Sequence, residues 1–194
     1  MKSRLSLAVV WFVFVAVAVI GRLWQPTWQG QPLWNVTPMA GVALAAGAVF
    51  PNTLVAASVP LFAIGISNLV LPAYGSFLMG IVVFAAMTWP IFLGKIARSG
   101  KWLPILGGAL ASSLVFFLTT NLACWVPGSM YPRSFEGLIA CFSAALPFYR
   151  WMPVGDLVWT AAIFTGLKLT GLVPSGICVI TSSGQTDLTG QKTT

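Results

Sequence analysis

Few side chains in this chain are of types that do chemistry. The sequence has 194 residues, no His and three acidic residues, Glu136, Asp156 and Asp187. His is the usual general base and the commonest metal ligand, so its absence leaves no ordinary nucleophile–base pair and no familiar metal site. Glu136 and Asp156 alone are a thin basis for acid–base chemistry. We therefore expect no enzymatic activity, no cofactor and no bound metal.

The three cysteines, Cys124, Cys141 and Cys178, lack the spacing of a metal site. Free Cys usually behaves as a small apolar side chain, and we interpret these residues in that way. A disulfide between Cys124 and Cys141 stays open, because both fall near one face of the membrane expected below.

The distribution of charge indicates a membrane protein. Of the residues, 58% are hydrophobic and 7% are charged, and no Asp, Glu, Lys or Arg occurs between Arg22 and Lys95. A soluble domain cannot leave so long a stretch uncharged, whereas a spanning helix needs about 20 mainly apolar residues. The net charge of +7 comes from cations scattered between apolar segments. We therefore expect the lipid bilayer as surroundings and no nucleic acid as a partner.

Six segments are long enough to cross, which predicts an all-α polytopic bundle of six transmembrane helices. A further apolar stretch at 136–148 is too short, so we expect a short re-entrant or interfacial helix before the last span, with a seventh crossing as the alternative. Pro60 and Pro90 lie inside spans, where kinks are expected. The segments are Leu5–Leu23, Val36–Phe50, Thr53–Leu71, Ala73–Gly94, Leu103–Ala123 and Val154–Leu172.

The N-terminal segment and the loops predict the orientation. Ala16-Val17-Ala18 resembles a signal-peptidase site, but the apolar run continues through Ile20, so we expect an uncleaved first span. The cations before span one lie on the same side as those between spans four and five, which predicts cytoplasmic N- and C-termini in a bacterial inner membrane. Residues 1–173 then form a single transmembrane domain, and residues 174–194 form a polar, disordered cytoplasmic tail.

With this topology, polar side chains from several spans lie at the outer side. Asn68, for example, would lie about 24 Å from the cytoplasmic start of its span. Polar groups at membrane depth usually line a cavity or pathway, so the set predicts a substrate-binding site. The candidate residues are Trp34, Asn35, Thr37, Asn68, Thr120, Asn121, Trp125, Arg133, Glu136, Arg150 and Asp156.

Each of these candidates also has a purely structural interpretation. Trp24, Trp28 and Trp34 in the first outer loop are typical of an interfacial aromatic belt, with a lid over the site as the alternative. For the others, the alternatives are a helix cap at Thr37-Pro38, ion pairs Arg133–Glu136 and Arg150–Asp156, and hydrogen bonds across helices from Asn68 and from Asn121.

The order of features from Asn35 onward carries a resemblance. Asn35-Val36-Thr37-Pro38 opens a short span, a tight turn follows at Phe50-Pro51, the next span ends at Ser67-Asn68, and Leu146-Pro147-Phe148 leads into the last one. In this the chain resembles the S components, the substrate-binding subunits of energy-coupling factor transporters. It is more closely similar to a family of small bacterial six-span membrane proteins without an assigned function, in which we expect the stretch 116–121, Trp125 and Gly155-Asp156.

The resemblance implies a small metabolite captured from the outer side, with uptake driven by a coupling transmembrane subunit and ATPases in trans. The chain has no Gly-rich phosphate-binding loop ending in Gly-Lys-Ser/Thr, so it cannot hydrolyse ATP itself. The alternative is a non-transporting membrane subunit or assembly factor. In that case small residues four apart, Gly41 with Ala45 and Ala43 with Gly47, would serve helix contacts with a partner.

Overall fold

Helices form most of the described structure. The computed structural model describes residues 6–174 apart from 25, 29, 34 and 128, so the tail predicted to be disordered lies outside this part. The predicted all-α class is confirmed, with the addition of one antiparallel hairpin of two short strands. The elements are α1 (Leu7–Leu23), β1 (Thr27–Trp28), β2 (Gln31–Pro32), α2 (Met39–Val49), α3 (Thr53–Ser67), α4 (Phe77–Thr88), the 3-10 helix η1 (Trp89–Phe92), α5 (Gly94–Ala97), α6 (Trp102–Trp125), α7 (Phe135–Tyr149) and α8 (Met152–Leu169).

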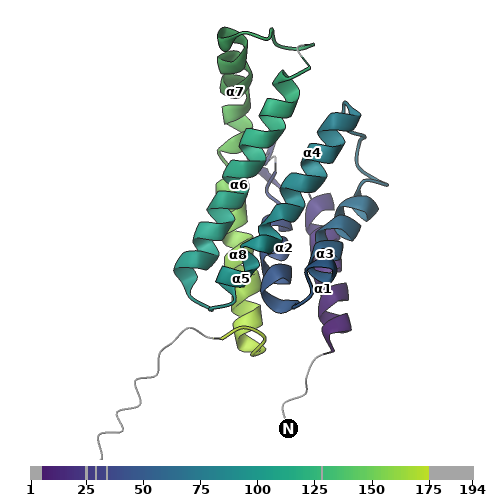
Figure 1. The fold of residues 1–194 in the computed structure, drawn as a ribbon, viewed down its shortest axis with the longest axis vertical. Helices are drawn as coiled ribbons and strands as arrows, with labels where there is room; N and C mark the ends of the chain where they lie inside the picture. Colours follow the sequence, from purple (N-terminus) through teal and green to yellow (C-terminus); the bar gives the residue numbers. More distant parts are fainter. Residues whose placement is uncertain (1–5, 25, 29, 34, 128, 175–194) are drawn as a thin grey trace, which may run out of the picture.

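The helices alternate in direction along the bundle (Figure 1). The lower end is where α1 begins, α5 lies and α8 ends, and the upper end is the opposite one. α1, α3 and α6 run upward, whereas α2, α4 with α5, and α7 with α8 run downward. Hydrogen bonds agree with the parallel course of α1 and α3: Trp11 Nε1 donates to Ser58 Oγ (2.8 Å) in their lower parts, and Arg22 Nη1 donates to Asn68 Oδ1 (2.8 Å) at their upper ends.

The short helix predicted before the last span forms, but it is not re-entrant. Arg150 and Trp151 alone separate α7 from α8, which continues in the same direction (Figure 1). Both helices lie antiparallel to α6, and the rings of Phe117 on α6 and Tyr149 on α7 have centroids 4.4 Å apart. The re-entrant expectation is wrong, because the brief connection lets α7 and α8 share α6 as one packing surface.

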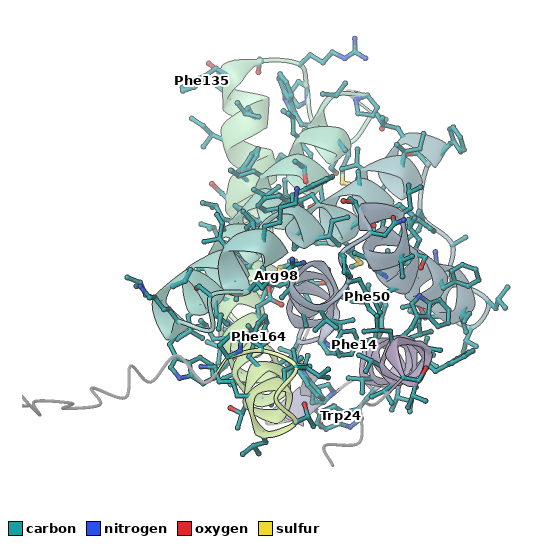
Figure 2. The ribbon with its side chains drawn as sticks, turned by 60° about the horizontal axis from the view of Figure 1, so that its bottom comes forward. Phe14, Trp24, Phe50, Arg98, Phe135 and Phe164 are labelled. Carbon is teal, nitrogen blue, oxygen red and sulfur yellow. The ribbon has the colours of Figure 1, made fainter. Side chains whose placement is uncertain are left out.

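α2 is the centre of the bundle, and it is short. Every residue from Met39 to Ala48 is buried, as expected for a helix covered on all sides. Figure 2, which brings the lower end forward, shows the other helices around it. The helix begins directly after Pro38, and Phe50 is extended (φ −86°, ψ 124°) because Pro51 follows it. Its 11 residues rise about 16 Å, roughly half of a hydrocarbon layer of ~30 Å.

α2 crosses η1 with the two backbones in contact. Pro90 has no N–H, and around it the predicted fourth span changes to the 3-10 geometry of η1 before it continues as α5. A Cβ built on Gly47 would lie 1.9 Å from the carbonyl oxygen of Ile91, and one on Gly94 would lie 2.3 Å from the carbonyl carbon of Gly47. Only glycine fits on either side of this crossing.

The lower end of α2 is held by a cation and an aromatic pair. Arg98, which lies beside the end of α2 in Figure 2, donates from Nε to the carbonyl oxygen of Ala48 (2.8 Å). Its Nη2 also reaches the carbonyl oxygens of Gly47 and Phe50, at 3.4 and 3.5 Å. The rings of Phe14 and Phe50 meet edge to face with centroids 6.2 Å apart. A cation at a helix C-terminus also stabilises the helix dipole.

The sides of the bundle are apolar. Side chains such as Phe77, Leu103 and Leu54 are 87%, 86% and 80% exposed. Two helical segments, Phe77–Ala97 and Trp102–Trp125, are long and apolar enough to cross a membrane, and only 28% of each is buried inside the protein. α1, α2, α3 and α7 are apolar but shorter. Within residues 6–174, two helices could therefore span a membrane by their length and composition, which is a smaller statement than the six spans predicted.

Candidate functional site

A hollow lies beyond the N-terminal end of α2, in the upper half of the bundle. It consists of two adjoining cavities of about 190 Å³ and about 160 Å³, which share Asn35 and Phe116 as lining residues. Asn35, Val36 and Thr37, the residues just before α2, line its first cavity. We call it the upper hollow, and its polar lining consists of Arg22, Asn35, Thr37, Tyr74, Thr120 and Asn121.

Asn35 joins the two cavities and has an unusual backbone. Its φ of 62° lies in the left-handed region, which Asn tolerates better than most residues because its side chain bonds locally. The carbonyl oxygen of Asn35 accepts a hydrogen bond from the backbone N–H of Thr37 (3.0 Å), just before α2 begins. This bend brings both side chains to the hollow. The alternative role of Thr37 as a helix cap is not realised, because the residue at the cap position is Pro38, without a side-chain bond.

Thr120 and Asn121 line the second cavity from α6. The hydroxyl of Thr120 donates to the carbonyl oxygen of Phe116 (2.7 Å), and Asn121 Nδ2 donates to that of Phe117 (2.7 Å). Each side chain therefore bonds its own helix, so for Asn121 the alternative of a side-chain bond across helices is not realised among the described residues. The amide oxygen of Asn121 has no hydrogen-bond partner in the described structure and remains available to a ligand.

The main lining residue that the sequence analysis missed is Arg22, in the last turn of α1. Its Nη1 donates to Asn68 Oδ1 (2.8 Å), to the hydroxyl of Ser67 and to the carbonyl oxygen of Ile64 (3.4 Å). Its Nη2 donates to the hydroxyl of Tyr74 (2.9 Å). The available signal was its position, since Arg22 is the last charge before the long uncharged run and marks the outer end of a predicted span.

Asn68, predicted to contact a ligand, instead fixes Arg22. It lies just beyond α3, which ends at Ser67 and not at Leu71 as predicted. Its Oδ1 accepts from both Arg22 and the hydroxyl of Tyr74 (3.3 Å). Asn68 does not line the hollow. The arrangement orients the guanidinium from the side away from the cavity.

The walls of the hollow are largely aromatic. Trp24, Tyr74 and Phe116 line the first cavity, and Phe117 and Tyr149 line the second. The indole of Trp24 is 58% exposed, and its edge meets the ring of Trp159 on α8, centroid to centroid 6.3 Å. Trp34 and the side chain of Trp28 lie outside the described residues.

Three further predicted site residues, Trp125, Arg133 and Arg150, do not line the hollow. Trp125 Nε1 donates to the carbonyl oxygen of Pro132 (3.0 Å), and Arg133 Nη2 donates to that of Pro127 (3.1 Å). The guanidinium of Arg150 lies 5.7 Å from the ring centroid of Trp151. These contacts organise the loop and the helix junction. The alternative ion pairs, Arg133–Glu136 and Arg150–Asp156, are not formed.

Glu136 is exposed in the first turn of α7. Its own backbone N–H and the hydroxyl of Ser134 donate to the carboxylate and hold the pKa of Glu136 below its usual value. Ser134 also caps the helix by accepting from the backbone N–H of Gly137 (3.2 Å). Glu136 therefore belongs to the start of a helix, away from the upper hollow.

Asp156 is buried close to the hollow but does not line it. The residue is 2% exposed, and its Oδ2 has no hydrogen-bond partner in the described structure. Met152, one turn above on the same face of α8, lines the second cavity. The hydroxyl of Thr160, one turn below, is also buried without a partner and lies against Gly41 of α2. An unsatisfied pair of polar groups at the α2–α8 contact is costly.

The cysteines form no disulfide in the described part of the chain. Cys124 and Cys141 are free, and Cys178 lies outside it. The thiol of Cys141 donates to the carbonyl oxygen of Asn121 (3.5 Å), which ties α7 to α6 beside the second cavity. No cluster of three or more His, Cys, Asp or Glu side chains occurs among the described residues. The upper hollow offers aromatic surfaces, amides and one guanidinium, which are groups that bind small ligands.

Comparison with known proteins gives one family. No curated protein and no solved structure matches the chain significantly. The model of the family of unknown function DUF6580 matches residues 2–174, and the chain belongs to that family.

Proposed function

We propose that this chain is a six-span membrane protein that binds a small metabolite from the outer side of a bacterial inner membrane, in the manner of the S components of energy-coupling factor transporters. The observation that carries the proposal is the half-length central helix. α2 fills only the lower half of the bundle, and the space above it is lined by polar and aromatic side chains from elements far apart in sequence.

The apolar exterior supports the membrane arrangement. Soluble monomers rarely expose contiguous apolar patches of more than a few hundred Å², yet large apolar side chains are exposed on most helices of this bundle. The alternating directions of the helices in Figure 1 correspond to six crossings when η1 and α5 continue α4, and α7 continues into α8.

The cations support the orientation. Lys95, Arg98, Lys101 and Lys168 lie at the lower end, and by sequence Lys2 and Arg4 precede α1 there. Under the positive-inside rule this end faces the cytoplasm, and the upper hollow faces outward. Cysteines introduced at Ser129 and Ser99, in a variant without native Cys, test this. A membrane-impermeant maleimide should label position 129 in intact cells and position 99 only after permeabilisation. The reverse result would overturn the outward-facing site.

Ligand binding is tested on the purified full chain. A metabolite present at 100 times its Kd adds ~2.7 kcal/mol of stability, which raises the Tm of a chain of this size by roughly 5–10 °C. We expect Asn121→Ala to weaken the binding of such a ligand about tenfold, because the amide is lost from the second cavity. A broad metabolite library without any shift would contradict the proposal.

Two threonines provide a matched control. Thr120 and Thr165 each donate to a carbonyl four residues earlier at 2.7 Å, but Thr120 lines the hollow and Thr165 is exposed away from it. Replacing either with Ala removes the same local bond. Thr120→Ala should weaken ligand binding, whereas Thr165→Ala should leave the Kd within about twofold, less than the effect of one hydrogen bond. Equal effects would place the ligand elsewhere.

Uptake in this proposal depends on a coupling transmembrane subunit and ATPases, and co-purification from the native membrane tests it. The second candidate is a non-transporting subunit or assembly factor. An apolar groove of about 470 Å³ between α4 and α6, which could accept a partner helix, favours it. However, Gly41 and Gly47 pack against α8 and η1 inside the bundle, so they are not available to a partner. A stable complex without ATPases would support this second function.

A further inference from the structure

The charge of Arg22 is not compensated by any acidic side chain of the described structure. All of its hydrogen-bond partners are neutral: two hydroxyls, one amide oxygen and one carbonyl oxygen. Of the acidic residues, Glu136 is exposed at the start of α7, Asp156 is buried without lining the hollow, and Asp187 lies outside the described residues. The side chains that line the upper hollow therefore carry one positive charge and no negative one.

Arg22 also has hydrogen-bonding capacity left. A guanidinium has five N–H donors in a planar fork. The bonds to Ile64, Ser67 and Asn68 all use Nη1, and the bond to Tyr74 uses one N–H of Nη2. Nε and the second N–H of Nη2 have no acceptor among the described residues. Because Arg22 lines the first cavity, a carboxylate there could take up these donors as well as the charge.

The start of α2 also favours a negatively charged group. Val36 and Thr37, immediately before the helix, line the first cavity. No side chain caps this terminus, and its first turn contains no acidic residue. The free N–H groups and the positive end of the helix dipole favour a negative group nearby. This terminus adds to the field of Arg22 in the same cavity.

The remaining walls select the rest of the ligand. Together the two cavities reach only the low end of the range of about 300–1,000 Å³ that is typical of drug-sized ligands, so the ligand is small. The aromatic side chains on the walls offer flat apolar surfaces. Resting on the proposed function, we propose that the upper hollow binds a small organic anion with a flat apolar body, such as an aromatic monocarboxylate, and that its carboxylate is held by Arg22.

A series of three probes of similar shape tests this in the wild-type full chain reconstituted in lipid nanodiscs. Benzoate is an anion, benzamide is its neutral analogue and benzylamine is a cation at neutral pH. Binding is followed by the fluorescence of Trp24 and the other tryptophans, and for probes of this size we expect a Kd of about a millimolar. Benzoate should bind about tenfold more tightly than benzamide, and benzylamine more weakly than either, because only the carboxylate makes charge-assisted bonds.

Two arginine variants test whether Arg22 causes the tighter binding of benzoate. Arg22→Gln should reduce the advantage of benzoate over benzamide to within about twofold, because the cation of the first cavity is gone. Arg133→Gln removes an exposed cation at the same end of the bundle, outside the hollow, and should leave the advantage unchanged. Equal losses in both variants would show a general surface field and overturn the assignment to Arg22.

The other outcomes also decide the matter. If wild-type protein binds benzamide or benzylamine as well as benzoate, the anion inference is overturned while the proposed function stands. This comparison needs no variant, so it holds even if Arg22→Gln fails to fold. If chloride or phosphate competes as well as benzoate, the proposal that the ligand has a flat apolar body is overturned. If no probe binds at about 10 mM, the ligand class is wrong, and the metabolite library alone then decides the proposed function.

Discussion

Replacing Gly47 with Ala tests the backbone contact between α2 and η1. The added Cβ would lie 1.9 Å from the carbonyl oxygen of Ile91 and 2.7 Å from its carbonyl carbon, whereas ordinary contacts begin at 3.4 Å. The two elements would have to separate by about 1.5 Å, and no side-chain rotation can relieve the clash because the opposing atoms are backbone. Separation would also strain the bonds of Arg98 to the end of α2.

Two terms set the expected magnitude. Overpacking of a core costs about 1–3 kcal/mol and more where the backbone must move, so a value of about 3 kcal/mol applies here. The change from Gly to Ala in a helix stabilises the folded state by about 1 kcal/mol, because Ala has the higher helix propensity. The net destabilisation of about 2 kcal/mol corresponds to a fall in Tm of about 4–8 °C for a chain of this size.

The measurement is thermal unfolding of the purified variants in one detergent, followed by tryptophan fluorescence. Gly107→Ala in α6 is the matched control, because a Cβ there would meet nothing within 4 Å. It should keep or raise the Tm, since only the helix propensity changes. If Gly47→Ala unfolds at the same temperature as Gly107→Ala, the close crossing of α2 and η1 is refuted.

Three further predictions use the same assay. Arg98→Met should lower the Tm by about 2–4 °C, because the carbonyls at the end of α2 lose a charged donor worth about 1 kcal/mol at an exposed site; Lys101→Met, which removes a cation of the same loop, should leave it unchanged, and equal effects would contradict the cap. Thr160→Val should raise the Tm by a few degrees, because an unpartnered buried hydroxyl is replaced by a methyl group; a fall would indicate a hydrogen bond that the structure lacks. Asn35→Gly should keep the Tm and Asn35→Ala should lower it by about 2–4 °C, a loss of about 1 kcal/mol of stability, because the left-handed φ of 62° suits Gly and not Ala; the same Tm for both would contradict the left-handed bend.

The sequence predicted that the second helix is short because the limits of that helix are local; its central position was not predicted. Pro38 and the Phe50-Pro51 turn restrict the backbone directly, and the small apolar residues between them suit a helix covered on all sides. The predicted short helix at 136–148 forms at Phe135–Tyr149 for a similar reason, since Ser134 caps it. Its relation to α8 could not be predicted, because it depends on packing against α6.

The site was predicted in part. The upper hollow is lined by four of the predicted residues, Asn35, Thr37, Thr120 and Asn121. The sequence could group these residues because they lie at similar depth within the predicted spans. Depth does not give the direction of a side chain around the helix, so Asp156 was placed at the correct level but faces the interior without lining the cavity. Arg22 was missed because a charge at the end of an apolar segment has the same pattern whether it faces headgroups or a cavity.

The brevity of α2 also bears on how the chain is made. Eleven residues are too few to be recognised as a crossing by themselves, so in the proposed membrane arrangement α2 would be inserted together with α3 as a hairpin. Its sides, which are rich in Ala and Gly, would then contact lipid or the insertion machinery until synthesis supplied the helices that cover them. The contact of Gly41 with Thr160 belongs to α8, the last helix of the described residues. A chain that ends before Met152 would therefore leave α2 uncovered on the side where α8 packs.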